Sequence, residues 1–592
     1  MKPLRSLLPY FRPYRKGIAA GLALVVIGNA FVVAGPYVLK IAIDALTAEL
    51  RPELIPRYAL LIVGVALLGG IARYGMRELL NGISRRMETD IRADLFDHLM
   101  RLPPQFFDSW RTGDLMSRAT NDVQAVRMVA GPAIMYAVNT LAVSAFALGL
   151  MIWIDPMLTL VAMIPMALLP PAVFTFGKRI HRRFERIQSQ FSELSSFAQE
   201  NLAGVRIVKA YAREDAQAGR FAALNEEYMV RNLALARVWG AFHPSLILLT
   251  GVGGVVVLWF GGGQVIGGDI TIGDFVAFSF YLTQLMWPMI ALGWVTNLFQ
   301  RGAASMGRLN ELFAIEPAIA DPEHPAPAGP VRGAVEFEDV GFRYPGTDTP
   351  VLEGVSFRIE AGQTIAVVGA TASGKTTLAR LIPRLYDVTD GAVRIDGIDV
   401  RDMPLAHLRD SVAVVPQEPF LFSMRLRRNI ELRYDDGADD AWPESLEHAI
   451  DVAQLRKTLQ VLPDGIDTRL GERGINLSGG QKQRATLARA LYRDAPILIL
   501  DDALSAVDTQ TETAILRGLR AYMAGRTSII VSHRVSAVRD ADLILVLDDG
   551  RIVERGRHDD LISAGGVYTR LLERQLLAEE LEHQPALTGE GG

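Results

Sequence analysis

The sequence predicts a multi-domain membrane protein in which an all-α membrane domain precedes an α/β domain. Three observations support this fold class. Long apolar segments occur only in the first half of the 592 residues, β-rich and helical patterns alternate in the second half, and a Pro/Ala-rich stretch, DPEHPAPAGP, separates the two. The composition agrees, because 50% of the residues are hydrophobic although 21% are charged. Such a mixture is typical of a membrane part joined to a soluble part.

Five segments of the first half are near or above the length of about 20 apolar residues that crosses a bilayer as a helix, and a sixth, the second along the chain at 58–72, is shorter. Arg73 and Arg77 interrupt the second segment. We count it as a span because arginines can face a helical bundle or snorkel to the interface; a buried soluble helix is the alternative. The first segment is too long for a cleaved signal peptide, and no small-residue cleavage site follows it. Within a membrane domain of residues 1–320, we place the spans at about 17–45, 55–80, 128–154, 156–178, 238–266 and 273–300.

The placement of Lys and Arg predicts a multi-pass protein of the cytoplasmic (inner) membrane, with both termini and the second domain in the cytoplasm. Basic residues are dense in three segments, at 1–16, 85–127 and 178–237, whereas the short connections between the other span ends carry few. The N-terminal segment is expected to be a short helix along the inner membrane surface. Helical periodicity in the long basic connections indicates that spans two to five continue as helices well beyond the membrane. The cytoplasmic tips of these helices are then 106–122 and 205–217.

Charge and cysteine content exclude some classes of function. The formal net charge of −5 is small for this length and argues against a dedicated nucleic-acid binder. The chain has no cysteine, which excludes disulfides and thiolate metal sites.

From Val335 the pattern changes to short β-rich runs that alternate with helical ones, such as TIAVVG before TLARLIPRLY. This alternation predicts an α/β domain built around a largely parallel sheet. We place a linker at 321–332, the α/β domain at 333–575, and a disordered polar tail at 576–592.

The strongest motif of the second half is GATASGKT, which lies between the strand TIAVV and the helix TLARLI. Its spacing and context predict a phosphate-binding loop, whose glycines let backbone N–H groups approach phosphate oxygens. The next helix offers its positive end, Lys375 reaches the β- and γ-phosphates, and Thr376 binds Mg²⁺. The nucleotide-binding residues expected here are Gly369, Ala370, Thr371, Ala372, Ser373, Gly374, Lys375, Thr376 and Thr377.

Two further motifs belong with this loop. The segment ILILDDALSAVD is an apolar strand that ends in Asp501 and Asp502. Asp501 is the natural second ligand of the Mg²⁺, although an aspartate at a strand end can also be a helix cap. LSGGQ, at 477–481, opens the helix KQRATLARALY and forms another anion-binding helix end. By itself it could be an ordinary capped helix.

Together these motifs resemble the nucleotide-binding domain of ABC transporters, and the six spans before it make the chain resemble a type I ABC exporter half-transporter. GERG at 471–474 and SAVD at 505–508 match further family motifs. The resemblance implies that Tyr344 in FRYPG stacks on adenine and that Gln417 in VVPQEPF senses Mg²⁺ and the attacking water. It implies that Asp502, His533 and Gln417 are the catalytic residues, that Thr376, Gln417 and Asp501 hold the metal, and that the signature residues bind ATP, namely Ser478, Gly479, Gly480 and Gln481.

The resemblance also implies a mechanism. Two such domains close head to tail around two ATP molecules, each held between the phosphate loop of one chain and LSGGQ of the other. Closure moves the long helices through coupling regions, which TGDLMSR and VKAYARED resemble, and turns the membrane cavity from inward-facing to outward-facing. Hydrolysis resets the cycle, so the chain is expected to be an ATPase with ATP and Mg²⁺ as cofactors.

At the position of Asp502 the family usually has Glu, which polarises the attacking water. The aspartate side chain is one methylene shorter, and a misplacement of about 1 Å can cost about 10²-fold in rate. We therefore expect a hydrolytically weak site and a heterodimer with a Glu-bearing partner, as in the Asp-bearing half of heterodimeric bacterial multidrug exporters, which DDALSAVD resembles. A homodimer with two active sites is the alternative. Ala372 is a second departure, since a Gly is common there.

The function expected from this resemblance is ATP-driven export of hydrophobic or amphipathic compounds. A lipid flippase is an alternative, and an ATP-gated membrane regulator without transport is a second one. The expected partners are a second half-transporter, the lipid bilayer and a small hydrophobic substrate, without nucleic acid. Some polar and aromatic residues of span six could line a drug cavity or simply pack and contact lipid, and none is assigned as a site: Phe278, Tyr281, Gln284, Met286, Trp287 and Trp294.

Overall fold

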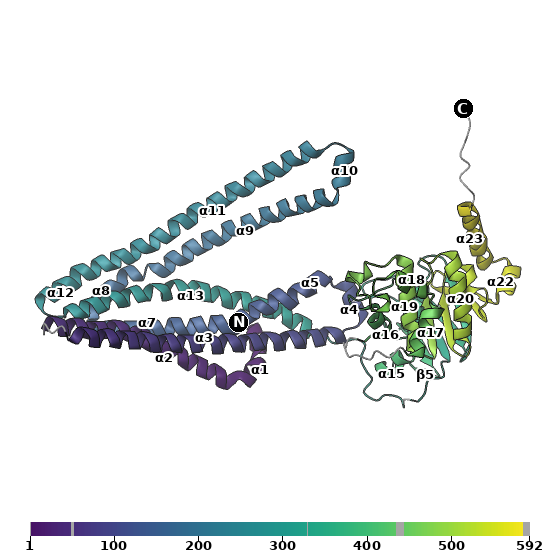
Figure 1. Cartoon of the computed structure of the whole chain (residues 1–592), viewed down its shortest axis with the longest axis horizontal. Helices are drawn as coiled ribbons and strands as arrows, with labels where there is room; N and C mark the ends of the chain where they lie inside the picture. The colour runs from purple at the N-terminus through teal and green to yellow at the C-terminus, as the bar shows by residue number, and fades with distance from the viewer. Residues whose placement is uncertain (1, 49–52, 328, 434–442, 584–592) are drawn as a thin grey trace. The chain divides into compact units, whose positions relative to one another are not determined.

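The computed structural model describes residues 2–48, 53–327, 329–433 and 443–583, and the chain divides into two compact units (Figure 1). The first unit, hereafter the membrane unit, comprises Met1–Met100 and Arg111–Ile315. The second, hereafter the ATPase unit, comprises Arg101–Trp110 and Glu316–Gly592. The short segment Arg101–Trp110 thus groups with the α/β part, although sequence analysis assigned it to the membrane domain. Residues 49–52 of the first connection lie outside the described residues.

Within its described residues, the membrane unit has six helical stretches that are long and apolar enough to cross a membrane, as the sequence predicts. Because an α-helix rises about 1.5 Å per residue, the 48 residues of α3 span about 72 Å, more than twice a hydrocarbon core. The six stretches are Lys2–Ala48, Leu54–Arg101, Thr112–Ile154, Pro156–Ala203, Glu214–Gly267 and Ile272–Phe313. The prediction that helices continue beyond the membrane is therefore confirmed.

These stretches are built from long α-helices, with short turns and π-helical segments between some of them. After η1 (Lys2–Leu7), α1 (Leu8–Phe11) and η2 (Arg12–Tyr14) come α2 (Arg15–Ala48), α3 (Leu54–Arg101), α5 (Thr112–Ser117), η3 (Arg118–Asp122), α6 (Val123–Met128), η4 (Val129–Ala133), α7 (Ile134–Ile154), α8 (Pro156–Met166), α9 (Leu169–Ala203), α10 (Val205–Ala210), α11 (Glu214–Val256), η5 (Val257–Gly261), α12 (Gly262–Gly267) and α13 (Ile272–Phe313). Pro132 lies inside η4 and cannot donate a helical hydrogen bond. A local π-helical turn accommodates this loss.

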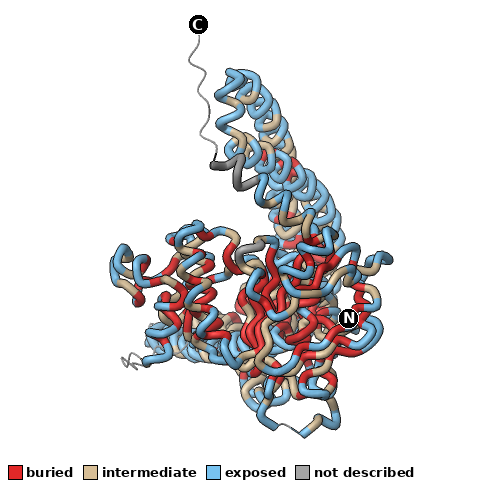
Figure 2. The backbone as a smooth tube through the Cα atoms, turned by 90° about the vertical axis from the view of Figure 1, so that its right-hand side faces the viewer, coloured by how far each residue is buried: buried red, intermediate tan, exposed pale blue. Residues whose placement is uncertain are grey.

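Helices α9 and α11 lie side by side and are joined by α10 (Figure 1). This hairpin is mostly exposed (Figure 2). Several of its large apolar side chains face solvent, including Leu202, Ile207 and Tyr211, which are 74%, 66% and 74% exposed. Exposed apolar side chains gathered on one element mark a surface that another molecule covers.

The C-terminal end of α2 is tied to the start of α13 by polar contacts. Lys40 and Asp274 form an ion pair at 2.6 Å, with side chains only 15% and 12% exposed. Asp44 Oδ1 accepts a hydrogen bond from the Gly273 N–H at 3.0 Å, and a Cβ at Gly273 would come within 2.5 Å of the Lys40 carbonyl oxygen. Further along, Tyr281 donates to the Val33 carbonyl at 3.0 Å. Tyr281 and Phe278 are fully buried, so in this chain these two side chains pack inside the bundle.

The ATPase unit contains two sheets. The six-stranded sheet has the order β10-β9-β3-β8-β7-β6, and its strands are parallel except for β10, which is antiparallel to β9. The four-stranded sheet, β2-β1-β4-β5, is antiparallel. The strands are β1 (Val335–Phe342), β2 (Leu352–Ile359), β3 (Thr364–Gly369), β4 (Asp390–Ile395), β5 (Ile398–Asp399), β6 (Val412–Val415), β7 (Ile497–Asp501), β8 (Thr527–Val531), β9 (Leu543–Asp548) and β10 (Arg551–Gly556).

The helices of the ATPase unit complete an α/β fold, as expected. They are α4 (Pro104–Ser109), α14 (Lys375–Leu381), α15 (Leu405–Asp410), α16 (Leu426–Glu431), α17 (Glu444–Val452), α18 (Arg456–Val461), η6 (Gly465–Asp467), η7 (Glu472–Gly474), α19 (Gly479–Arg493), α20 (Thr509–Met523), α21 (Val535–Val538), α22 (His558–Ala564) and α23 (Val567–His583). The carboxyl ends of β3, β8 and β7 meet at one edge of the sheet, because these three strands are neighbours and parallel. In open α/β sheets this edge is where ligands bind.

Two segments differ from their expectations. The predicted tail at 576–592 is partly helical, since α23 continues to His583; Val567 and Leu571 pack against the core and anchor the start of this helix. Residues 584–592 lie outside the described residues. The linker at 321–332 is held on the domain surface, because Asp321 accepts from the Leu405 N–H and Ala326 donates to the Asp402 carbonyl.

We expect Lys40→Met to lower the stability of the detergent-solubilised chain by about 3 kcal/mol, because removing one member of a buried ion pair leaves the other charge unpaired. Thermal unfolding of the purified protein measures this change. Lys178→Met is the matched control, since this lysine is exposed. The double variant Lys40→Met with Asp274→Asn should recover part of the loss. A Lys40→Met protein as stable as the control would contradict the prediction.

Candidate nucleotide-binding and ATPase site

The phosphate loop connects β3 to α14 and needs glycine at two positions. A Cβ at Gly369 would lie 2.1 Å from the Leu547 carbonyl oxygen, and one at Gly374 would lie 2.8 Å from that of Val351. Gly374 also has a φ of +100°, a conformation that side chains disfavour. These close approaches fix the two ends of the loop against Leu547 and Val351, immediately before the first turn of α14. The start of a helix carries N–H groups that can bind an anion.

Lys375 is held by the loop itself. Its Nζ donates to the carbonyl oxygens of Gly369 at 3.1 Å and Ala370 at 2.6 Å, and to Ser373 Oγ at 3.3 Å. Burial lowers the pKa of Lys375, while Asp502 and Asp501 raise it. The Lys375 ammonium is partly buried and donates only to uncharged oxygens, so its positive charge is not neutralised by these partners. Negatively charged phosphate oxygens would offset the free-energy cost of burying this charge.

Thr376 and Asp501 form an oxygen-rich corner beside the lysine. Thr376 Oγ1 donates to Asp501 Oδ1 at 3.1 Å, and Asp501 is only 4% exposed. Burial raises the pKa of Asp501. Gln417, in the loop after β6, lines the same pocket. Hydroxyl, carboxylate and amide oxygens suit Mg²⁺. No cluster of three or more His, Cys, Asp or Glu side chains in the described part of the chain is placed to bind a metal. Thr376, Asp501 and Gln417 are the residues that would hold a Mg²⁺ at this corner, together with phosphate oxygens of the nucleotide.

Asp502 and His533 come from the ends of the neighbouring strands β7 and β8. The Asp502 N–H donates to the Val531 carbonyl at 2.8 Å, and Asp502 Oδ1 lies 2.9 Å from His533 Nδ1. This hydrogen bond raises the pKa of His533. Asp502 has a φ of +48°, in the left-handed region. Aspartate adopts this conformation more readily than most residues, because its short polar side chain can bond locally.

Tyr344 lies at the other end of the same pocket. Its hydroxyl is 3.0 Å from Thr377 Oγ1, and either atom can be the donor. The ring packs edge-on against Tyr386, with centroids 5.4 Å apart. Tyr386 in turn donates to Asp108 at 2.6 Å, within the ATPase unit. Asp108 belongs to α4, so the first predicted cytoplasmic tip contacts the aromatic residues behind the expected adenine position.

One pocket collects most of the residues that the sequence singled out. It is lined by Tyr344, Val351, Gly369, Thr371, Ala372, Gly374, Lys375, Thr376, Thr377, Gln417, Asp501, Asp502, Val531, Ser532 and His533. Ala370 and Ser373 contribute through their contacts with Lys375. Three lining residues are not among the predicted ones, namely Val351, Val531 and Ser532. Val531 and Ser532 directly precede His533, whereas Val351 reaches the pocket only through the fold.

The signature residues form a separate, exposed helix end. Ser478 is the N-cap of α19 and forms a capping box with Gln481, whose Oε1 accepts from the Ser478 N–H at 2.9 Å. Gly479 and Gly480 follow in the first turn. Among the described residues, these four are not part of the pocket around the phosphate loop. They are therefore free to contact a nucleotide held elsewhere.

Comparisons with known proteins agree with this organisation. Residues 18–289 match the family model of the ABC transporter transmembrane region, and residues 352–505 match the model described as ABC transporter. The chain is 38% identical to the multidrug resistance-like ATP-binding protein MdlA of Escherichia coli (strain K12), over 99% of this chain and 98% of that protein. It is 33% identical to an ATP-dependent lipid A-core flippase of Syntrophus aciditrophicus, with coverage of 98% and 96%.

A solved structure, that of a bacterial Atm1-family ABC exporter with ATP bound, superposes with a TM-score of 0.76 at 28% identity and covers 95% of this chain and 98% of that one. The chain belongs to the ABC transporter family. It is an ATP-hydrolysing half-transporter of the type I exporter class, with a membrane domain fused to its ATPase domain.

We expect Ala372→Gly to stabilise the protein slightly. Ala372 has a φ of +67°, a conformation that costs an L-residue roughly 1–2 kcal/mol, whereas the extra chain entropy of glycine costs roughly 0.4–1 kcal/mol. The net gain, of up to about 1.6 kcal/mol, should raise the unfolding midpoint by up to about 2 °C. Ala370→Gly is the control, because φ at Ala370 is not positive and only the entropic loss applies. Equal effects of both substitutions would contradict the strain at Ala372.

Proposed function

We propose that this chain is one half of a heterodimeric multidrug-type exporter, and that its own ATP site hydrolyses slowly. The observation that carries the proposal is Asp502, a short carboxylate at the position where the family usually has Glu. Its hydrogen bond to His533 supports a catalytic location, since both side chains line the phosphate-loop pocket. We further propose that the protein lies in the cytoplasmic membrane with both termini in the cytoplasm, as its distribution of basic residues favours.

In this proposal, the residues of the pocket divide the work of ATP hydrolysis. Tyr344 stacks on the adenine, the N–H groups from Gly369 to Thr377 hold the phosphates, and Lys375 exchanges its carbonyl partners for phosphate oxygens. Thr376, Asp501 and Gln417 would hold Mg²⁺, which when bound neutralises charge on the β- and γ-phosphates. Asp502 orients and polarises the attacking water, and His533 donates a hydrogen bond towards the γ-phosphate.

Two features of this chain support a second chain in the working transporter, the exposed α9–α11 hairpin and the position of the signature residues. ABC exporters function as dimers, and the exposed apolar side chains of the α9–α11 hairpin supply a surface for another molecule to cover. In addition, Ser478 and the signature glycines lie outside the pocket of their own chain. The proposal is that they complete the ATP site of the partner, as the family resemblance implies.

The length of the Asp502 side chain supports an asymmetric pair. Because its carboxylate is one methylene shorter than that of Glu and is bonded to His533, it lies further from the water that attacks the γ-phosphate. A shortfall of about 1 Å can cost about 10²-fold in rate. The intact LSGGQ of this chain would still complete a fast site on a Glu-bearing partner, so that one site of the pair turns over and the other mainly holds nucleotide.

We expect Asp502→Glu to raise the ATP turnover of the chain purified alone by at least 10-fold, because the longer side chain restores the position of the base. Steady-state phosphate release measures this change. Asp502→Asn is the matched control and should lower the turnover below that of the wild type. A wild-type chain with full turnover that Asp502→Glu leaves unchanged would overturn the heterodimer proposal in favour of a homodimer with two active sites.

The substrate class is proposed from the relatives and from the membrane unit. The multidrug resistance-like relative is more similar to this chain than the lipid A-core flippase. Trp287 and Trp294 of α13 are 57% and 43% exposed, and aromatic side chains adapt to varied amphipathic ligands. Lipid transport is the second candidate, because one of the relatives is a lipid A-core flippase. Regulation without transport is disfavoured because Lys375, Asp501, Gln417 and His533 all match the family.

We expect inside-out vesicles that contain the assembled transporter to accumulate a fluorescent amphipathic drug when Mg-ATP is added. Lys375→Ala should abolish uptake, because it removes the phosphate-binding cation. Translocation of a labelled phospholipid without drug uptake would favour the flippase. If neither compound moves while ATP is hydrolysed, the export proposal is wrong.

A further inference from the structure

Gln483 is a buried polar side chain that neither the sequence motifs nor the proposed mechanism explains. It lies in α19, two residues after the signature, and is only 2% exposed. Its Nε2 donates to Ser505 Oγ at 2.8 Å, and its Oε1 accepts from the Ala506 N–H at 2.9 Å. Both hydrogen-bonding atoms of one amide therefore hold the loop that follows the catalytic strand, hereafter the 503–508 loop.

The first turn of α19 also touches this loop directly. A Cβ at Gly480 would come within 2.7 Å of the Ala506 carbonyl oxygen and 3.8 Å of Val507 Cα. The second signature glycine thus permits backbone-to-backbone packing that a larger residue would prevent. Packing at Gly480 and the hydrogen bonds of Gln483 both involve Ala506, and together they reach Ser505, Ala506 and Val507. The start of the signature helix is therefore in close contact with three consecutive residues of the 503–508 loop.

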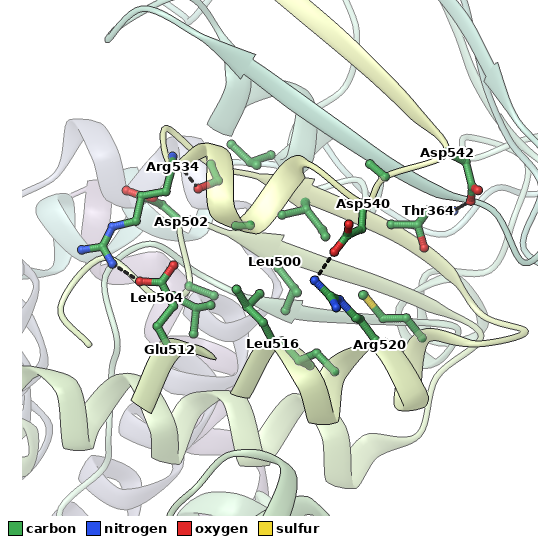
Figure 3. A pocket seen from close by; sticks show the side chains of 18 of the residues that line it. Thr364, Leu500, Asp502, Leu504, Glu512, Leu516, Arg520, Arg534, Asp540 and Asp542 are labelled. Atoms are coloured by element: carbon green, nitrogen blue, oxygen red, sulfur yellow. Dashed lines mark hydrogen bonds and ion pairs between the residues drawn. The ribbon is translucent and has the colours of Figure 1, made fainter. Parts of the chain in front are cut away.

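The loop is connected just as closely to the catalytic residues of its own chain. The Ser505 N–H donates to the Asp502 carbonyl at 3.3 Å, and Arg534 Nη2 donates to the Ser505 carbonyl at 3.0 Å. Arg534 follows His533 in the chain and forms an ion pair with Glu512 of α20 (Figure 3). Ser505 is therefore the point at which contacts from the signature helix and from the His533 segment meet.

The 503–508 loop is held by apolar and by polar contacts. Ala503, Leu504 and Val507 are buried in the core of the ATPase unit, and Leu504 also lines a pocket with Leu500 and Leu516 (Figure 3). Between these apolar residues, Ser505 and Ala506 are fixed by their hydrogen bonds with Gln483 and Arg534. These polar contacts therefore orient the middle of the loop, beside Asp502.

We propose that Gln483 is a positioning residue that couples the signature motif to the catalytic carboxylate of the same chain. A displacement of α19, when LSGGQ engages the nucleotide held by a second chain, is carried by Gln483 to Ser505 and Ala506 and from there to Asp502. This inference rests on the proposed composite ATP site. It implies that Asp502 of each chain is correctly placed only when the LSGGQ motif of that chain contacts the nucleotide bound to the other chain.

The test is ATP turnover of the full-length chain in lipid nanodiscs, purified without a Glu-bearing partner so that each site contains Asp502. Gln483→Leu removes both hydrogen bonds while keeping similar bulk. It should lower kcat at least 10-fold with KM for Mg-ATP within twofold of the wild type, and leave the unfolding midpoint within about 2 °C. Thr486→Val is the matched control, since Thr486 is 1% exposed on the same helix and bonds only to Lys482 among the contacts described. It should leave kcat and KM unchanged.

Ser505→Ala gives a second, milder test that does not depend on folding of a core variant. It removes one of the two bonds to Gln483, so kcat should fall by about threefold at constant KM. The double variant Gln483→Leu with Ser505→Ala should have the same kcat as Gln483→Leu alone. Gln483→Leu already removes the hydrogen bond that Ser505→Ala would remove.

The inference is overturned if Gln483→Leu and Ser505→Ala both keep the wild-type kcat. It is also overturned if each loss of kcat comes with a proportionate fall in the unfolding midpoint and Thr486→Val lowers kcat to the same extent. Asp502→Asn separates this result from failure of the proposed function. If Asp502→Asn lowers turnover while Gln483→Leu does not, only the coupling role is wrong. If Asp502→Asn has no effect, the role of Asp502 and the inference fail together.

Discussion

The parallel pairing of β3, β8 and β7 is the constraint on which the ATPase site depends. Asp501 is in register with Val531, and Val531 with Val367 two residues before the phosphate loop. This register brings the phosphate loop, the two aspartates and His533 to one edge of the sheet, although Thr376 and Asp501 are 125 residues apart in the chain. Strand pairing therefore sets the distances that the chemistry needs, and the loops only refine them.

The electrostatics of this edge are arranged for ligands that bring their own charge. Burial lowers the pKa of Lys375 and raises the pKa of Asp501, so each group is held where its charged form is disfavoured. A triphosphate relieves the first cost and a divalent cation the second. The burial that disfavours these charges in isolation thus favours binding of a nucleotide. In the proposed dimer, the free energy gained would be available to drive closure of the two chains.

Asp502 is the residue at which the proposed chemistry and the proposed coupling to the signature helix meet. It follows β7 in a left-handed conformation, bonds to His533 and leads directly into the loop that Gln483 holds. A short carboxylate in such a constrained place is sensitive to small shifts of the loop. In the proposed mechanism, the single methylene that separates Asp from Glu would affect both the rate of hydrolysis and the dependence of that rate on the signature helix.

The sequence by itself determined the fold class, the six membrane spans, the phosphate loop and nearly all residues of the pocket, because hydropathy and motif spacing are written in consecutive residues. It also indicated the long helical extensions. Tertiary structure alone decided which polar residues act between elements: Gln483 with Ser505, Arg534 with Glu512, Tyr386 with Asp108, and Lys40 with Asp274. It likewise extended α23 into the predicted tail. The partners in most of these contacts are distant along the chain, and no local pattern specifies which surfaces the folded core brings together.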